Sequence, residues 1–448
     1  MGEQEGGGTR RATRRRRWLR IGLALGIVVV LVGAAAVVYG VQLAARFNSN
    51  VHRSDALTRA FGDEAASPSA STAPPTLSKD TNILVMGLDS RLDENGQPLP
   101  PDILDALQAG DDSGGFYNAN VLMLVHIPAD GSQATAISIP RDDYVEIAGI
   151  PGGGGFSTKI KEAYSYGFAA EQSALLSQGK PNDDATYQAA RDAGRAAQIA
   201  TVSQFLGGVP IDHFVEVTMV AFYQVALAIQ PITVCVNRAT QDAYSGADFR
   251  AGVQQIDARQ AMAFVRQRRD TSDPTYDFTD LDRTRRQQAF VASVLHQLTQ
   301  AGTFTNLPKM EAVLDAVSKN MAVDRNLDLL LLAQQARSLT GGNITFTTLP
   351  IVGFGWSPEG AAINVVDVPA IQALVKELLA PKPVQPTTPP PASAPASPEG
   401  APSSDGVDQS TASGAPSETA SATPVPSPPP TYEDWKSPLQ GGSVPCVK

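Results

Sequence analysis

The sequence predicts an α/β protein: a single α/β/α domain with a central mixed β-sheet, preceded by one transmembrane helix and followed by a disordered Pro/Ser/Ala-rich tail. Three features predict this arrangement. Apolar and amphipathic runs alternate over residues 81–380, residues 21–45 carry no charge, and residues 381–431 contain no aromatic side chain. A chain of 448 residues, of which 42% are hydrophobic, can bury a large core and still contain segments that do not fold.

The uncharged run at 21–45 is predicted to span a membrane. As an α-helix with a rise of about 1.5 Å per residue it would be roughly 38 Å long, which exceeds the ~30 Å hydrocarbon core of a bilayer. Residues 1–20 carry seven arginines, which predicts a cytoplasmic amino terminus and an extracytoplasmic domain on a single-pass cell-membrane anchor. A cleaved signal peptide is the alternative, because Ala34 to Ala36 are small, but the run is longer than the ~7–15 apolar residues of a signal.

Low-complexity segments flank the predicted domain. Residues 46–80 are predicted to form an extracytoplasmic stalk and residues 381–431 a disordered linker, because neither can bury enough apolar surface to offset its conformational entropy. Residues 432–448 differ, since aromatic residues and Cys446 return there, and the only other cysteine is Cys235 in a predicted core strand. Because an extracytoplasmic compartment favours oxidation, we expect a Cys235–Cys446 disulfide that docks this segment on the domain. Two independent thiols are the alternative.

The elements of the domain follow from the spacing of its apolar residues. Short runs that are β-branched or continuously apolar, and bounded by Gly, Pro or Asp, predict buried strands. These strands are 82–88, 121–127, 135–139, 213–217, 233–236, 344–349 and 363–366. Runs with apolar residues three and four apart predict helices at 187–207, 256–268, 281–298 and 326–339. Helices that alternate with strands predict a sheet covered on both faces.

Polar side chains directly follow two of the predicted strands. The first strand reaches Gly87 and is followed by Asp89 and Arg91, and the strand at 135–139 is followed by Arg141. Ligands of open α/β sheets bind outside the carboxyl ends of the strands. We therefore expect these side chains to lie along one ligand-binding edge.

The stretch 263–290 contains six arginines, five aspartates and no lysine. The planar guanidinium group, with its five donors, suits phosphate oxygens better than the point charge of lysine does, so the stretch favours an oxyanion ligand. A solvated, salt-bridged surface is the alternative, and Arg269 and Arg285 are assigned to the surface. The net charge of −10 argues against a general nucleic-acid-binding protein, because binding to phosphate backbones needs a basic face.

The spacing of the arginines predicts how they are presented. Arg266 and Arg268 are two residues apart and cannot share one helix face. We therefore expect the helix to end near Val265, so that both side chains can enter one cleft. Arg283 and Arg286 are three residues apart and can share a face of the next helix.

Seven motifs follow the predicted anchor in a fixed order: NILVMGLDSR, LVHIPADG, SIPRDDY, TKIKEAY, IDHFVEV, AMAFVRQRRD and DRTRRQQAF. In this order they resemble the LytR-CpsA-Psr family of cell-wall enzymes, over about residues 82–380, and the preference for Ala, Gly, Pro and Arg suggests an actinobacterial-type subfamily. The resemblance implies a phosphotransferase that moves a polyprenyl-(pyro)phosphate-linked glycopolymer onto peptidoglycan, usually onto the muramic acid 6-hydroxyl. It also implies assistance by Mg²⁺, with Mn²⁺ as an alternative. A teichoic-acid-like polymer and arabinogalactan both stay open as the glycan.

The resemblance implies roles for individual residues. Asp89, Arg141, Arg266 and Arg268 match catalytic positions, and Arg91, Lys159, Arg283 and Arg286 match pyrophosphate-binding positions. Asp89 is implied to hold the metal or to activate the acceptor hydroxyl.

The sequence departs from the family pattern before the second strand. Asn118 stands where many members have an arginine, and Asn120 where they have an aspartate. An asparagine can offer its carbonyl oxygen to a cation but cannot act as a base. Mg²⁺ then binds through Asp89 and Asn120 with one carboxylate fewer, or another carboxylate compensates, or the activity has changed. The candidates for compensation are Asp111, Asp112 and Asp142.

Two further functions stay open. Asn120 supports a noncatalytic module that only binds polyprenyl phosphate or wall polymer, and metal-dependent turnover separates it from the transferase. An envelope-linked transcriptional regulator is disfavoured, because only about 20 residues without a helix-turn-helix would be cytoplasmic. Pyrophosphatase activity is a side reaction that the same site allows. The expected partners are a polyprenyl-linked glycan donor, the peptidoglycan acceptor and the membrane, and no nucleic acid.

Overall fold

A computed structural model describes the fold over residues 51–62, 79–109, 117–153, 155–273, 275–300, 318–327, 342–381 and 428–448. The predicted transmembrane helix at 21–45 lies outside these residues, as do nearly all of the predicted linker at 381–431 and most of the predicted helix at 326–339. Among the helices that the structure describes, none combines the length and the hydropathy needed to cross a bilayer.

Eight strands form the central sheet, in the order β1, β12, β7, β2, β3, β4, β13, β17. Their bounds are His52–Ser54 (β1), Thr81–Leu88 (β2), Ala119–Ile127 (β3), Ala134–Ser138 (β4), His213–Thr218 (β7), Met321–Asp324 (β12), Ile344–Thr348 (β13) and Leu439–Gln440 (β17). β2 pairs in parallel with β7 and antiparallel with β3, and β4 pairs in parallel with β13. The sheet is therefore mixed, as the sequence predicts.

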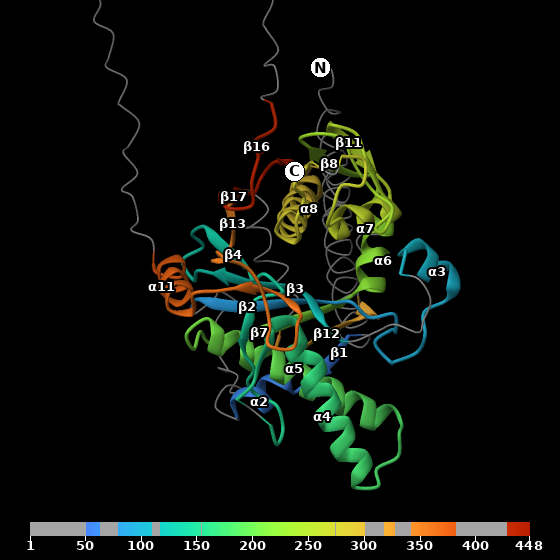
Figure 1. Cartoon of the computed structure of the whole chain (residues 1–448), viewed down its shortest axis with the longest axis vertical. Coiled ribbons are helices and arrows are strands. Elements are labelled where there is room, and N and C mark those ends of the chain that lie inside the picture. Colours follow the sequence, from blue (N-terminus) through green and yellow to red (C-terminus); the bar gives the residue numbers. More distant parts are fainter. Residues whose placement is uncertain are drawn as a thin grey trace, which may run out of the picture. The chain divides into compact units, whose positions relative to one another are not determined.

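Helices cover both faces of this sheet, with α2, α4 and α5 on one side and α6, α7 and α8 on the other (Figure 1). Their bounds are Ala56–Phe61 (α2), Ala163–Ser177 (α4), Asp184–Phe205 (α5), Met219–Ile229 (α6), Ala258–Arg266 (α7) and Asp280–Gln300 (α8). Successive side chains of a strand point to opposite faces. Leu84 and Met86 of β2 accordingly join a core with Ile199 of α5, whereas Val85 packs against a second core that contains Phe290 of α8.

Residues 51–62 belong to the domain, although they lie within the stalk predicted at 46–80. β1 pairs in parallel with β12 at the edge of the sheet. Ala56 and Leu57 of α2 are buried in the core on the α5 side. Only a few apolar residues anchor this segment, and they lie in a polar stretch. The average composition of the stretch therefore did not indicate that it folds.

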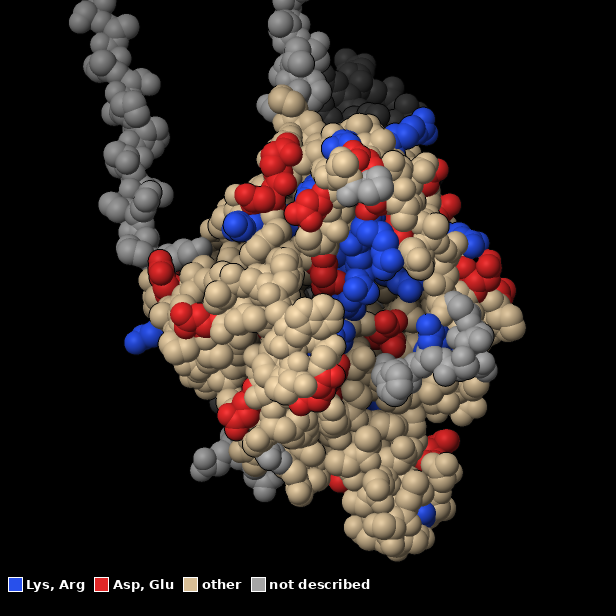
Figure 2. All heavy atoms as spheres, viewed as in Figure 1, with Lys and Arg blue, Asp and Glu red and all other residues tan. Residues whose placement is uncertain are grey.

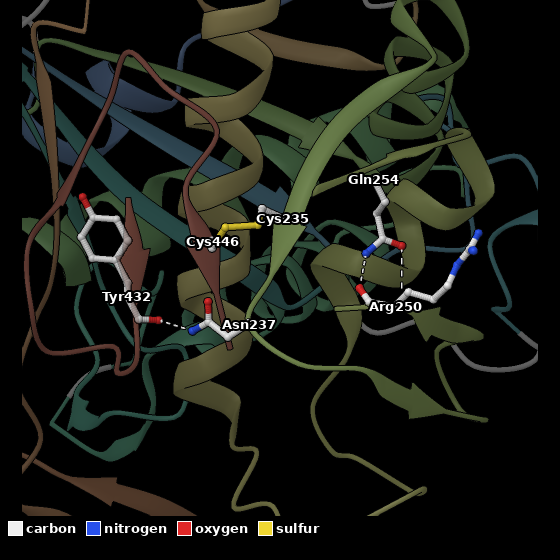
Figure 3. The surroundings of a disulfide bond; sticks show 6 residues. All are labelled: Cys235, Asn237, Arg250, Gln254, Tyr432 and Cys446. Atoms are coloured by element: carbon white, nitrogen blue, oxygen red, sulfur yellow. Dashed lines mark hydrogen bonds between the residues drawn. A yellow bond between two sulfur atoms is a disulfide. The ribbon is translucent and has the colours of Figure 1, made fainter. Parts of the chain in front are cut away.

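A second sheet carries the predicted disulfide. Its strands, in order, are Gly252–Ile256 (β11), Ile232–Val236 (β8), Cys446–Val447 (β18) and Thr431–Tyr432 (β16), and a separate hairpin pairs Thr240–Asp242 (β9) with Ala247–Phe249 (β10). Cys446 lies opposite Cys235 in the parallel β18–β8 pair, and the two are bonded, which confirms the prediction. Figure 3 shows the backbone carbonyl of Tyr432 accepting a hydrogen bond from the Asn237 side chain beside this bond. The last residues described therefore return to the domain.

A buried ionic network ties the segment after β2 to the sheet. Arg191 and Arg195 of α5 both donate to Glu216 of β7 and to Glu94, which follows β2. All four side chains are almost fully buried. Two guanidinium groups thus face two carboxylates in a region without solvent, and the segment that carries Glu94 is held beside the carboxyl ends of β2 and β7.

Candidate active site at the carboxyl ends of the central strands

A cavity of about 340 Å³ lies at the carboxyl ends of β2 and β7, bordered by helices α6, α7 and α8. Much of its lining is apolar. These residues include Val85, Met86, Leu88, Met123, Met219, Phe222, Met262, Val265 and Phe290. The remainder is polar and contains five arginines beside Asp89 and Asp242, and Figure 2 shows Lys and Arg gathered into a dense patch near the centre of the face in view. The cavity therefore joins an apolar compartment to a strongly basic one.

Four arginines of the predicted site line this cavity together: Arg141, Arg266, Arg268 and Arg283. Helix α7 ends at Arg266 and the backbone turns extended at Gln267, so Arg266 and Arg268 reach the same cavity, as predicted. Arg283 lies in the first turn of α8, and Arg141 follows β4. The ends of two helices and one strand thus bring the guanidinium groups together.

Asp280, at the start of α8, is the shared counter-ion of three of these arginines. Its carboxylate lies 3.0 Å from Arg141 Nη2, 3.1 Å from Arg268 Nε and 3.0 Å from Arg283 Nη2. Asp142 Oδ2 also lies 3.5 Å from Arg141 Nε, so two carboxylates pair with a cluster of four positive charges. Arg268 is the most open of the three partners, with 47% of its side chain exposed.

The arginine cluster has more positive than negative charges, and burial lowers the pKa of two of its members. Burial lowers the pKa of Arg283 to about 9; Asp280 opposes this shift, and the nearby Arg141 and Arg268 add to it. Burial likewise lowers the pKa of Arg266. The Nε of Arg283 is buried and finds no hydrogen-bond acceptor among the residues that the structure describes. Crowded and desolvated cations of this kind favour the binding of an anion between them.

Asp89, Asn120 and Arg141 form a chain of hydrogen bonds at the end of β2. Asn120 Nδ2 donates to Asp89 Oδ2 over 2.6 Å, and Arg141 Nη1 donates to Asn120 Oδ1 over 2.7 Å. Asp89 is exposed and lines the cavity. Its carboxylate has Asn120 as its only hydrogen-bond partner in the described part of the chain. The neutral amide of Asn120 thus connects the exposed Asp89 carboxylate to the arginine cluster.

These residues offer a divalent cation few ligands. Within the described ranges, no three Asp, Glu, His or Cys side chains gather into a group that could hold a metal ion. The carbonyl oxygen of Asn120, a predicted ligand, is already bonded to Arg141. Asp89 remains as the carboxylate that can bind a cation. A single carboxylate fits Mg²⁺ when substrate phosphates and water supply the other ligands.

Of the three carboxylates that could compensate for Asn120, the structure describes only Asp142, and this residue is engaged by lysines. Burial alone would raise the pKa of Asp142, but Arg141 and Lys161 outweigh it and hold the pKa below its usual value. Asp142 Oδ1 lies 2.7 Å from Lys161 Nζ and 3.8 Å from Lys159 Nζ, and Asp142 does not line the cavity. Asp111 and Asp112 lie outside the described residues.

Arg91, Lys159 and Arg286 are not among the residues that line the cavity. Arg91 Nε donates to the carbonyl of Ala109 over 2.6 Å. Lys159 faces Asp142. Both therefore lie next to the cavity arginines without lining the cavity, because Arg91 is close enough to add to the effect of burial in lowering the pKa of Arg266, and Lys159 shares Asp142 with Arg141.

The structure places Arg286 apart from the other predicted pyrophosphate-binding residues, because this side chain is fully buried and does not line the cavity. Its guanidinium group donates to the carbonyl of Lys448 over 2.8 Å, to Gln267 Oε1 over 2.5 Å and to Thr240 Oγ1 over 3.0 Å. The aromatic ring of Phe264 lies beneath it. Acceptors within the protein therefore already occupy the guanidinium donors of Arg286 that would otherwise bind a pyrophosphate.

The surface assignment fails for Arg285 and holds for Arg269. Arg285 is buried because the returning segment covers it: it lies over the ring of Tyr432 and donates to the carbonyl of Ser437. Arg269 is exposed, yet it also lines the cavity, where it stacks on Tyr244.

Sequence reasoning missed Asp280, Gln287, Tyr244 and Arg269 as cavity residues. A signal existed for two of them. Asp280 precedes Arg283 by three residues and Gln287 follows it by four, so both share its helix face. No comparable spacing marks Tyr244, whose position depends on the β9–β10 hairpin.

The sequence matches the LytR_cpsA_psr family over residues 44–379. The chain belongs to the LytR_cpsA_psr family. Over 300 residues it is 36% identical to the cell wall biosynthesis protein LcpA of Corynebacterium glutamicum. The aligned region covers 67% of this chain and 55% of LcpA. Over 250 residues it is 28% identical to the polyisoprenyl-teichoic acid–peptidoglycan teichoic acid transferase TagU of Bacillus mycoides, covering 56% of this chain and 66% of TagU.

The chain thus spans between about half and two thirds of the length of these relatives. Among solved structures, this LytR_cpsA_psr protein is similar to TagV of B. subtilis, with 20% identity and a TM-score of 0.45, over 67% of this chain and 97% of TagV.

Proposed function

We propose that this protein is a membrane-anchored, extracytoplasmic phosphotransferase that moves a polyprenyl-(pyro)phosphate-linked glycopolymer onto the muramic acid 6-hydroxyl of peptidoglycan. The observation that carries the proposal is the junction of an apolar cavity with four arginines. Family membership supports it, and so does the name of TagU, a transferase that joins teichoic acid to peptidoglycan.

The two compartments of the cavity match the two ends of such a donor. Met86, Met219 and Phe290 belong to an apolar lining that suits the polyprenyl chain, whose burial is favourable in proportion to the apolar area removed from water. Arg141 and Arg283 are buried next to it and can receive the pyrophosphate. The unpartnered Nε of Arg283 supplies one donor for a phosphate oxygen.

The reaction would proceed by displacement at phosphorus. The acceptor hydroxyl attacks the phosphorus that carries the glycan, a new P–O bond forms, and the bond from this phosphorus to the bridging oxygen breaks. Polyprenyl monophosphate leaves with the electron pair, and the hydroxyl proton passes to a base. The arginines stabilise the charge that develops on the leaving phosphate, which is the main contribution that a protein makes to phosphoryl transfer.

Asp89 is the residue proposed to receive that proton or to hold the cation. It is exposed in the cavity, and only Asn120 hydrogen-bonds to its carboxylate in the portion of the chain described. Mg²⁺, with Mn²⁺ as the alternative, would bind to Asp89 and to phosphate oxygens and would neutralise part of the pyrophosphate charge. Asn120 orients Asp89 by donating to it, and cannot itself accept the proton.

Transfer by the full-length chain in detergent tests the proposal. The donor is a short polyprenyl-pyrophosphate glycan, the acceptor is peptidoglycan, and each reaction is run with and without Mg²⁺. Arg266→Ala and Asp89→Ala should each lower kcat/KM by about 100-fold or more. Arg325→Ala is the matched control, because this exposed arginine pairs with Asp55 far from the cavity lining.

A noncatalytic binding module is the second candidate, and Asn120 favours it. The amide occupies the place between Asp89 and Arg141 where a second carboxylate would add negative charge for a cation. This alternative predicts tight donor binding that Arg266→Ala weakens, without product at any metal concentration. Metal-dependent product that Asp89→Ala abolishes would exclude it.

A further inference from the structure

An exposed aromatic ring stands at the opening of the cavity. Tyr244 belongs to the cavity lining, and 70% of its side chain is exposed. By contrast, Met86 and Met262 of the apolar compartment are 0% and 3% exposed. Tyr244 therefore lies where a bound donor would leave the cavity and enter solvent.

The tip of the β9–β10 hairpin holds Tyr244 in place. The Asp242 carboxylate accepts from the backbone N–H of Tyr244 over 3.0 Å and from the Ser245 hydroxyl over 2.9 Å. The N–H of Thr271 donates to the carbonyl of Gln241 over 2.7 Å, which ties the hairpin to the loop that carries the cavity arginines. Such local bonds fix a turn and reduce the entropy lost when a ligand packs on it.

Arg269 completes this feature on the same loop. Its guanidinium carbon lies 4.1 Å from the centroid of the Tyr244 ring, a stacked cation–π arrangement. Because most of Tyr244 stays exposed with Arg269 on one face, the ring can still accept a second group. The negative face of an aromatic ring attracts the C–H groups of a sugar ring, and guanidinium donors suit sugar hydroxyls.

We propose that Tyr244 and Arg269 form the subsite for the first sugar of the donor glycan. The proposal rests on the proposed function, in which the donor carries lipid, pyrophosphate and sugar in that order. The apolar lining, the four arginines and the exposed Tyr244 provide for the three groups within one cavity. Asp242 is a positioning residue here, since Tyr244 and Ser245 already engage both its oxygens.

Two lipid probes separate sugar recognition from lipid and pyrophosphate binding. One is polyprenyl pyrophosphate without a sugar, and the other is the same lipid carrying a single N-acetylglucosamine. Dissociation constants are measured for the full-length chain and for Tyr244→Ala, Tyr244→Phe and Arg269→Ala. Tyr166→Ala is the matched control, because Tyr166 is 45% exposed on α4 and does not line the cavity.

Tyr244→Ala should bind the sugar-bearing lipid about tenfold more weakly, as expected for the loss of one aromatic contact, and should bind the sugar-free lipid as the unaltered protein does. Tyr244→Phe should keep most of the affinity, because the ring is retained, and Arg269→Ala should weaken the sugar-bearing probe only. An equal loss on both probes, or no loss on either, would overturn the subsite while leaving the proposed function intact. Failure of the unaltered protein to bind either probe would refute the proposed function and the subsite with it.

Discussion

Replacing Glu216 by Gln tests how much the buried ionic network contributes to stability. Glu216 accepts from Arg191 Nη2 over 2.5 Å and from Arg195 Nε and Nη2 over 3.0 and 2.9 Å, and its side chain is 0% exposed. The glutamine would leave the two buried guanidinium groups with Glu94 as their buried carboxylate and, for Arg195, the partly exposed Asp192 at 2.9 Å. We expect the free energy of unfolding to fall by about 3–5 kcal/mol, the usual cost of removing one partner from a buried ion pair.

The stability of the protein should also decrease at acidic pH, as Glu216 becomes protonated. Burial alone would raise the pKa of Glu216, but Arg195 and Arg191 outweigh it and lower the pKa from 4.5 to about 2. A carboxyl group with a lowered folded-state pKa stabilises the fold fully above its unfolded pKa, and this contribution is lost as the pH falls from 4.5 toward 2. At about 1.36 kcal/mol per pKa unit, a shift of this size corresponds to a contribution on the order of 3 kcal/mol.

Urea unfolding followed by circular dichroism measures this effect at neutral and at acidic pH. Glu171→Gln is the control, because its 3.2 Å pair with Arg59 is partly exposed and should contribute less than about 1 kcal/mol. The double substitution Arg195→Met with Glu216→Leu leaves Arg191 balanced by Glu94 and should recover part of the loss. The reasoning is refuted if Glu216→Gln costs no more than Glu171→Gln and leaves the acid dependence of stability unchanged.

Three other outcomes are expected. Arg283→Gln should weaken binding of polyprenyl pyrophosphate by about 10- to 100-fold in titration calorimetry, because it removes a charge-assisted donor from the cavity; an unchanged dissociation constant would contradict this. Cys235→Ala with Cys446→Ala should lower the free energy of unfolding by about 5 kcal/mol, since the bridge closes a loop with a sequence separation of 211. The prediction is disproved if neither the two substitutions nor added reductant changes the urea midpoint of unfolding. Protease added outside intact spheroplasts should digest the domain if residues 21–45 anchor it extracytoplasmically, and full protection would reverse the proposed topology.

Continuously apolar runs located strands such as β2 and β4 because these strands are buried on both faces, and apolar spacing of three and four residues located several of the helices. The predicted strand at 82–88 corresponds to β2 and the predicted helix at 187–207 to α5, each within a few residues of the observed bounds. Pattern reasoning missed three helices of ordinary length, α4, α6 and Val368–Leu378 (α11), and several short elements. β1 and α2 contribute few buried side chains each, so they leave little periodic signal in residues 51–62. β1 is placed by pairing with β12, a strand more than 260 residues away, and α2 by packing in the core on the α5 side.

The candidate site was predictable where chemistry and position along a strand or helix coincide. Asp89 and Arg141 follow strands that end at one edge, and the end of α7 at Arg266 lets two arginines reach one cavity. Local spacing could not tell Arg283 from Arg286, since both lie within one turn of α8. What separates them is tertiary: Arg283 faces the cavity, whereas Arg286 meets Thr240 of β9 and the returning segment.

Arg286 nonetheless stabilises the loop that carries the cavity arginines, although it does not line the cavity itself. Its guanidinium group holds the side chain of Gln267, the residue between the cavity arginines Arg266 and Arg268. Gln267 in turn donates from its amide to the carbonyl of Arg269. The same guanidinium group bonds to the carbonyl of Lys448, so the returning segment contacts the loop that presents three cavity arginines. Arg286 and the cavity arginines of this stretch thus have different roles in one structure: Arg286 fixes the loop, and Arg266, Arg268 and Arg283 line the cavity, where they can meet an anion.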